Sequence, residues 1–259
     1  MRLTRVYVEM PLAVGAELAL PEGPAAHLAR VLRLAAGDRC VLFNGDGQDY
    51  PAIVTAVGKR ELRVRLDAPV AVDNESSLRI VLLQGVARGE KMDLILQKAT
   101  ELGVAEVRPL VSQRSEVKLD AARAARRLTH WQGVVIAACE QCGRARVPRV
   151  AAPLPLSAVL AGLGTSPRGE RAHQGADADD LRLLLDPDGE LALNDLPLAN
   201  SHTEVILAVG PEGGWSPDDR GQLLAAGFAG LRLGPRILRT ETAGLAAIAA
   251  LQAGFGDLN

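Results

Sequence analysis

The chain has 259 residues, of which 48% are hydrophobic and 23% are charged, so it can form a packed core and global disorder is not expected. Its net charge of −2 gives no indication of a nucleic-acid partner by itself, and no apolar run approaches the roughly eighteen residues of a membrane-spanning helix. The first residues lack the apolar segment of a signal peptide, so we expect a cytoplasmic protein.

Residues 1–70 have the pattern of a small β-rich domain. Val6 and Val8 alternate with polar residues, which predicts a first strand, and a short helix is expected over 24–34. Further strands are expected over 38–43, 51–57 and 61–66. The segment Asn44-Gly45-Asp46-Gly47 is a strong hairpin signal between the first two of these strands. Several short strands with one helix predict a small barrel.

Residues 71–77 are polar and are predicted to form a linker to a second domain over 78–259. Apart from Arg79, the run from Leu78 to Leu83 is apolar, which is typical of a strand buried on both faces. Strands and helices then alternate, and this order predicts a parallel sheet with helices on both faces. The expected strands are 105–111, 182–185, 204–209 and 231–233, and the expected helices are 90–102, 120–142, 216–226 and 240–253. The polar stretch 164–180 is interpreted as a surface insertion.

Charge is unevenly distributed along the chain. Residues 88–149 hold twelve Lys or Arg against seven Asp or Glu, a net charge of +5, whereas residues 150–259 carry −7. This basic middle suits a phosphate-binding face, although solvated helix surfaces explain it equally well. Cys139 and Cys142 have the spacing of a redox motif, but no second pair or His-rich segment completes a zinc site, so packing on a helix is the favoured interpretation.

Two loop segments carry the strongest functional signal. The first, Gly210-Pro211-Glu212-Gly213-Gly214, follows an apolar strand, and its glycines allow the main chain to approach a ligand closely. Ser216 is expected to cap the next helix, with Pro217 at its first position. The pair Asp218-Asp219 disfavours a phosphate at that helix end. Alone, the segment is equally compatible with an ordinary strand–turn–helix connection.

The second segment runs from Leu233 to Ala243. Ile237 and Leu238 are apolar residues in a loop, so they are expected to pack on another apolar surface. An adenine ring is one candidate for that surface. Thr240 and Glu241 are expected to cap the last helix and to face the same pocket. Two such loops leaving neighbouring strands predict a site for a flat, nucleotide-like ligand.

The two segments together, Gly-Pro-Glu-Gly-Gly at 210–214 and Leu-Gly-Pro-Arg-Ile-Leu-Arg-Thr-Glu-Thr-Ala at 233–243, resemble the paired signature of the SPOUT-superfamily methyltransferases that form N3-methyluridine in 16S ribosomal RNA. Residues 91–104 and 140–144 resemble other segments of that family. Residues 27–38 are similar to part of its N-terminal PUA-like RNA-binding domain.

The resemblance implies an α/β fold: a C-terminal SPOUT domain, with a parallel sheet and a deep trefoil knot, and an N-terminal PUA-like β-barrel. It also implies a homodimer that uses S-adenosylmethionine to methylate uridine N3 in 16S rRNA, with the assembled 30S subunit as the expected substrate. The knot loops would be 185–188, 210–214 and 233–242. The expected cofactor-binding residues are Leu185, Gly210, Pro211, Glu212, Gly213, Gly214, Leu233, Gly234, Ile237, Leu238, Thr240 and Thr242.

Removal of the weakly acidic N3 proton requires a base or a positive group. Arg239 is the first candidate to stabilise the developing negative charge on the uracil and Arg236 the second, with Glu241 orienting either. The alternative for Arg239 is a structural salt bridge to Glu241 or Glu212. The sequence identifies no general base.

Basic side chains within residues 1–70 and 88–149 are candidate phosphate contacts, although any single one is more often a solvated surface charge. The expected RNA-binding residues are Arg2, Arg5, Arg30, Arg33, Arg88, Lys91 and Arg144, with Arg114, Arg123, Arg126 and Arg127 as further candidates. Aromatic residues are only 3% of the chain, so recognition through phosphates and RNA shape is expected over base stacking. The alternatives to an enzyme are an RNA-binding protein with a vestigial pocket and an α/β protein that binds a nucleotide phosphate.

Overall fold

The computed structural model describes residues 3–15, 17–58, 61–116, 120–163, 180–196 and 204–258. Contacts divide the chain into two compact units, Met1–Glu75 with Ile136–Val147 and Ser76–Val135 with Pro148–Asn259. The sequence placed residues 136–147 in the second domain, whereas here they pack with the first unit. Of the predicted insertion over 164–180, only Asp180 is described.

The first unit is built on a six-stranded sheet. Its strands are β1 (Arg5–Tyr7), β2 (Glu17–Ala19), β3 (Arg39–Phe43), β4 (Gln48–Val57), β5 (Leu62–Leu66) and β6 (Val70–Ala71). The order is β1-β3-β4-β5-β2, with β6 paired to β4, and every pair except the parallel pair β1–β3 is antiparallel. The predicted hairpin after Phe43 is confirmed, because β3 and β4 pair across residues 44–47.

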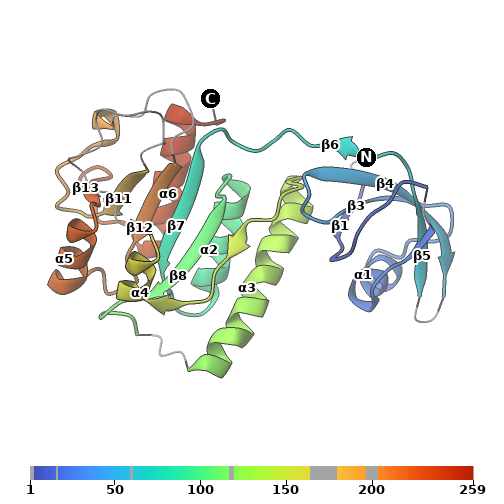
Figure 1. The fold of residues 1–259 in the computed structure, drawn as a ribbon, viewed down its shortest axis with the longest axis horizontal. Helices are drawn as coiled ribbons and strands as arrows, with labels where there is room; N and C mark the ends of the chain where they lie inside the picture. The colour runs from blue at the N-terminus through green and yellow to red at the C-terminus, as the bar shows by residue number, and fades with distance from the viewer. Residues whose placement is uncertain are drawn as a thin grey trace. The chain divides into compact units, whose positions relative to one another are not determined.

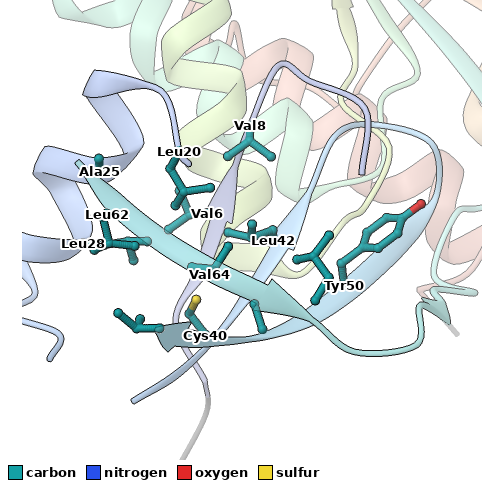
Figure 2. Close-up of a cluster of buried hydrophobic side chains, with 13 residues drawn as sticks. Val6, Val8, Leu20, Ala25, Leu28, Cys40, Leu42, Tyr50, Leu62 and Val64 are labelled. Atoms are coloured by element: carbon teal, nitrogen blue, oxygen red, sulfur yellow. The ribbon is translucent and has the colours of Figure 1, made fainter. Parts of the chain in front are cut away.

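One face of this sheet covers a hydrophobic core (Figure 2). In β5, Leu62, Val64 and Leu66 are buried while the two arginines between them are exposed, as the period of two in a strand requires. Helix α1 (Glu22–Ala26) continues as a π-helical turn over His27–Val31, and its Ala25 and Leu28 close the core. The observed helix therefore begins two residues before the predicted one.

The second unit contains a seven-stranded sheet. All its strand pairs are parallel, which confirms the predicted parallel sheet. Its strands are β7 (Arg79–Gly85), β8 (Glu106–Val111), β9 (Arg149–Val150), β10 (Leu154–Pro155), β11 (Leu181–Leu185), β12 (Glu204–Val209) and β13 (Ala229–Leu231). The order is β10-β8-β7-β12-β11-β13, with β9 paired to β8 (Figure 1). The predicted strand over 231–233 is found two residues earlier, as β13, so Leu233 and Gly234 lie in the following loop.

Helices pack on both faces of this sheet (Figure 1). They are α2 (Glu90–Glu101), α4 (Leu156–Ala161), α5 (Pro217–Ala225) and α6 (Thr240–Phe255), with a 3₁₀ turn at Leu193–Asp195. Helix α3 (Ala121–Cys142) contributes residues to both units. Leu156 of α4 and Leu223 of α5 share a core cluster with Val81 and Ile206 of the sheet. Alternate strand residues such as Leu82 point to the opposite face, where α6 packs on β12 and α2. No helix in the described residues is long and apolar enough to cross a membrane.

Strands β12, β11 and β13 are consecutive neighbours in the sheet and all are parallel. The segments that follow them therefore leave the sheet at one edge, the carboxyl edge. Ligands of open α/β sheets bind outside this edge. The fold thus brings the three predicted loops together.

Candidate active site

A cavity of about 1020 Å³ lies among these three loops. Most residues predicted to contact the cofactor or the reacting base line it. They are Leu185, Gly210, Pro211, Glu212, Gly214, Leu233, Gly234, Arg236, Ile237, Leu238, Arg239, Thr240 and Glu241. The volume is at the upper end of the range for small-molecule sites.

Gly213 and Thr242 were also predicted to contact the cofactor, but neither is among the residues that line the cavity. A Cβ atom on Gly213 would lie 2.9 Å from the carbonyl oxygen of Arg114, so this glycine packs against the neighbouring loop. Thr242 is exposed in the first turn of α6. Gly213 therefore lets this loop pack closely against Arg114 and is not part of the cavity lining.

The loop after β12 is held in contact with the start of α6. The Thr240 hydroxyl donates a 2.6 Å hydrogen bond to the carbonyl oxygen of Gly210 and accepts one of 3.0 Å from Gln84 Nε2. A Cβ on Gly85 would lie 2.5 Å from the nitrogen of Pro211, so only glycine permits this approach. Thr240 does not cap α6 as predicted: Arg239 is the N-cap residue, without a side-chain hydrogen bond.

The predicted start of α5 is confirmed. Ser216 accepts a hydrogen bond from the Asp219 amide, and the Asp219 carboxylate accepts one from the Ser216 amide. The carboxylates of Asp218 and Asp219 also accept hydrogen bonds from Gln113. This acidic helix end makes the adjoining wall unfavourable for a phosphate.

Two carboxylates that line the cavity each accept hydrogen bonds from more than one donor. Glu212 accepts from the Arg88 amide at 3.0 Å and from Lys91 Nζ at 3.4 Å. Burial raises the pKa of Glu212, but these donors together with its own amide outweigh burial, and the net pKa is lowered. Asp186 accepts from Arg220 Nε at 2.6 Å and from the Asp188 amide at 3.0 Å.

Several residues line the cavity that sequence reasoning did not assign to the cofactor site. Lys91 was predicted to contact RNA, and Arg114, Trp215 and Arg220 were given no role in the pocket. Trp215 directly follows the glycine pair, and this adjacency was a usable signal. Arg220 carried no such signal, because only the fold brings α5 to Asp186.

Arg236 and Arg239 are exposed at the cavity. Their side chains form no hydrogen bond or ion pair with any other residue that the structure describes. The alternative of a structural salt bridge from Arg239 to Glu212 or Glu241 therefore has no support in the described part of the chain. Both guanidinium groups are available to a ligand.

The predicted RNA contacts divide into two groups. Arg30, Arg33 and Arg88 are exposed, although Arg88 also pairs with Glu116. Arg2 lies outside the described residues. Lys91 lines the cavity. The last two members, Arg5 and Arg144, require a correction.

Arg5 is 9% exposed and donates to Asp49 at 2.6 Å and to the carbonyl oxygen of Cys139 at 2.7 Å. Arg144 is 5% exposed and binds Glu75 through two nitrogens. Because their hydrogen-bonding capacity is used inside the first unit, their predicted role as phosphate contacts is revised to a structural one. Arg5 connects residues 136–147 to strand β1, and Arg144 connects them to Glu75 after β6.

The three cysteines are free thiols. Burial raises the pKa of Cys40 to about 11 and the pKa of Cys139 to about 12, so both remain protonated near neutral pH. Cys139 donates a weak hydrogen bond to the carbonyl oxygen of Arg146. Within the described residues, no cluster of three or more His, Cys, Asp or Glu side chains could hold a metal ion.

Known proteins share this fold over the whole chain. A methyltransferase from Legionella pneumophila, solved in complex with S-adenosylmethionine, is 36% identical with a TM-score of 0.88, and each chain covers 100% of the other. A ribosomal RNA small subunit methyltransferase E from Neisseria gonorrhoeae, bound to S-adenosylmethionine, is also 36% identical with full coverage of both chains and a TM-score of 0.86. A ribosomal RNA small subunit methyltransferase E from Buchnera aphidicola is 30% identical over 258 residues, which is 100% of this chain and 99% of that protein.

A parallel α/β sheet with a cavity outside its carboxyl edge is the architecture of the α/β proteins that bind nucleotide-like ligands. The RNA methyltransferase domain family matches residues 74–252, and the RNA methyltransferase PUA domain family matches residues 25–67. The chain belongs to the RNA methyltransferase family.

Proposed function

We propose that this protein transfers a methyl group from S-adenosylmethionine to N3 of a uridine in 16S rRNA. The observation that carries the proposal is the cavity formed by loops 185–188, 210–216 and 233–241 at one edge of the sheet. Full-length relatives named small subunit rRNA methyltransferase E, and solved relatives with bound S-adenosylmethionine, support the same conclusion.

The residues present fit this cofactor. Backbone groups around Gly210 and Gly234 form the walls, and Ile237 and Leu238 supply apolar surface for an adenine ring. The indole Nε1 of Trp215 is buried and has no hydrogen-bond partner among the described residues, so it can donate to a polar ligand atom. When bound, S-adenosylmethionine supplies a methyl group on a positively charged sulfur. Glu212 provides negative charge at the cavity wall.

Arg239 stabilises the negative charge that develops on the uracil, and Arg236 assists it. Their support is position: both line the cavity, both are exposed, and neither is paired within the described residues. Preorganised cations of this kind contribute to catalysis because no reorganisation is needed as the charge forms. The chain itself otherwise acts by positioning the two reactants.

The assembled 30S subunit is the proposed substrate, and the proposed location is the cytoplasm. Exposed Arg30 and Arg33 in the PUA-like unit and the Arg88 region of the second unit are the proposed phosphate contacts. On helix α3, Arg123 and Arg126 are exposed one turn apart and are further proposed phosphate contacts. Such contacts bind RNA strongly but without sequence preference, so particle shape would select the target.

A homodimer and a trefoil knot complete the proposal. Ile237 is 85% exposed at the mouth of the cavity, which is unusual for a large aliphatic side chain and supports cover by a second copy. Light scattering during size-exclusion chromatography tests the dimer: a mass of one chain would contradict it.

Two measurements test the function. Isothermal titration is expected to show saturable binding of S-adenosylmethionine, and mass spectrometry is expected to detect N3-methyluridine after incubation with 30S subunits that lack the modification. Naked 16S rRNA serves as the comparison substrate and is expected to react more slowly. Absence of saturable heat would favour an RNA-binding protein without catalysis, and methylation at another atom would contradict the proposed target.

A further inference from the structure

Methylation at N3 requires that the uracil N3–H bond be broken, because the nitrogen lone pair is not free to attack while the proton is bound in the ring system. An acceptor within hydrogen-bond reach of the base must take this proton. The sequence identified no such group. Given the proposed function, one side chain at the cavity must serve as this acceptor.

Four carboxylates line the cavity, and three of them are poorly suited to the task. Glu212 accepts three hydrogen bonds, which lower its pKa and make it a weak base. Asp186 uses one oxygen for Arg220 and the other for the Asp188 amide. Asp188 itself is exposed, so water competes for its oxygens.

Glu241 differs from these three. It lies in the first turn of α6, two residues after Arg239, and its side chain is only 14% exposed. Its Oε2 atom is buried without a hydrogen-bond partner among the described residues. A buried acceptor with no donor carries an energetic cost, and use of the group by a ligand or a chemical step is one reason for a protein to retain it.

The ammonium group of Lys91 lies near the Glu241 carboxylate but is too far from it to donate a hydrogen bond. Lys91 Nζ lies 3.8 Å from Glu241 Oε2 and 3.4 Å from Glu212 Oε1, so it hydrogen-bonds to Glu212 and only attracts Glu241 electrostatically. Helix α6 is anchored at the preceding residue by the Thr240–Gly210 hydrogen bond. The free oxygen is therefore held in place on a rigid element.

We propose that Glu241 is the general base that takes the N3 proton of the target uridine. The proton moves to Oε2 and the N–H bonding pair remains on nitrogen, while Arg239 balances the charge on the uracil oxygens. This pair forms the new N–CH₃ bond as the carbon–sulfur bond breaks and its electrons pass to sulfur, so the sulfonium charge is cancelled. The protonated carboxyl group then releases its proton to solvent.

The test compares Glu241→Gln with the unaltered protein by single-turnover methylation of 30S subunits over a range of pH. Gln keeps the shape but cannot accept the proton, so the rate at neutral pH is expected to fall by about 100-fold or more. The rate of the variant is expected to rise about tenfold per pH unit as the uracil loses its proton unaided, while the unaltered protein levels off. Isothermal titration is expected to show unchanged affinity for S-adenosylmethionine.

A second substrate separates a chemical role from a structural one. RNA that carries 5-fluorouridine has a more acidic N3–H, so it is expected to restore much of the lost rate in Glu241→Gln. Glu101→Gln, a matched change in the surface pair with Lys98, is the control and is expected to behave as the unaltered protein.

The outcomes are distinguishable. A normal rate for Glu241→Gln, or a loss that is equal at every pH and on both RNAs and accompanied by weaker cofactor binding, overturns the role of Glu241 and leaves the proposed function intact. If the unaltered protein forms no N3-methyluridine, the proposed function fails and the assignment of Glu241 fails with it.

Discussion

The hydroxyl group of Thr240 and the carbonyl oxygen of Gly210 lie 2.6 Å apart and join the two loop segments that form the cavity. Thr240 is 7% exposed, and its oxygen also accepts a hydrogen bond from Gln84 on β7. One side chain thus connects the end of β12, the start of α6 and the neighbouring strand. The relative positions of the two loop segments that line the cavity therefore depend on the hydrogen bonds of Thr240.

Thr240→Val removes the hydroxyl and leaves the Gly210 carbonyl without this donor. Loss of a buried hydrogen bond costs about 1–3 kcal/mol, so we expect lower stability and about tenfold weaker binding of S-adenosylmethionine. Urea unfolding and isothermal titration measure the two effects. Thr129→Val, at an exposed threonine of α3, is the control, and equal cofactor affinity in both variants would contradict the connection.

Gly213→Ala is expected to destabilise the protein, because the new Cβ would lie 2.9 Å from the Arg114 carbonyl oxygen. Overpacking of this kind costs on the order of 1–3 kcal/mol. Gly221→Ala is the matched control: this glycine is exposed within α5 with no atom near the added Cβ, so alanine is expected to stabilise by about 0.5–1 kcal/mol. Thermal unfolding measures both, and changes of the same sign would contradict the packing seen at Gly213.

Arg239→Ala is expected to preserve the fold and cofactor affinity while slowing methyl transfer. Removal of one preorganised group that stabilises developing charge lowers rates by about 100- to 1000-fold. Single-turnover methylation of 30S subunits measures the effect. Arg232→Ala serves as the control because Arg232 is exposed after β13 and does not line the cavity, and equal rates in the two variants would exclude a special role for Arg239.

Arg5→Met is expected to destabilise the first unit by about 3–5 kcal/mol, because it leaves Asp49 and two carbonyl oxygens without their donor. Arg39→Met breaks the exposed pair with Asp67 and is expected to cost only about 0–1 kcal/mol. Denaturant unfolding compares the two. Similar values would show that Arg5 is not the structural element described above.

Glu212 is expected to make stability depend on pH. Its folded-state pKa is lowered, so its contribution is present above the unfolded pKa and is lost as pH falls through the lower, folded value. The difference in unfolding free energy between the unaltered protein and Glu212→Gln should therefore be largest at neutral pH and should shrink in acid. A difference that grows in acid would reverse the sign of the assigned shift.

Much of the second unit could be predicted because its signals are local. A continuous apolar run marks β7, helical spacing and Gly103 mark α2, and Ser216 with Pro217 marks the start of α5. The two glycine-bearing segments also follow strands that the order of elements places at one edge. Their positions on the cavity wall follow from topology alone.

Contacts between distant residues could not be predicted in this way. Arg5 and Arg144 belong to a residue type that often binds phosphate. Only the fold shows that carboxylates and carbonyl groups of the first unit accept their hydrogen bonds. Strands β9 and β10 contain two residues each, which is too short for a periodic signal. The free oxygen of Glu241 is likewise a property of its surroundings, because nothing in the residue type distinguishes it from Glu212.

The first unit is assembled from two separate stretches of the chain, and this has a consequence for biosynthesis. Arg5 and Glu75 leave the ribosome long before Cys139 and Arg144, the partners that complete their hydrogen bonds. The PUA-like unit therefore cannot mature during translation until more than half of the polypeptide has emerged, although domains usually fold from the amino end first. Its final packing must wait until residues 136–147, which include the end of helix α3, have been synthesised.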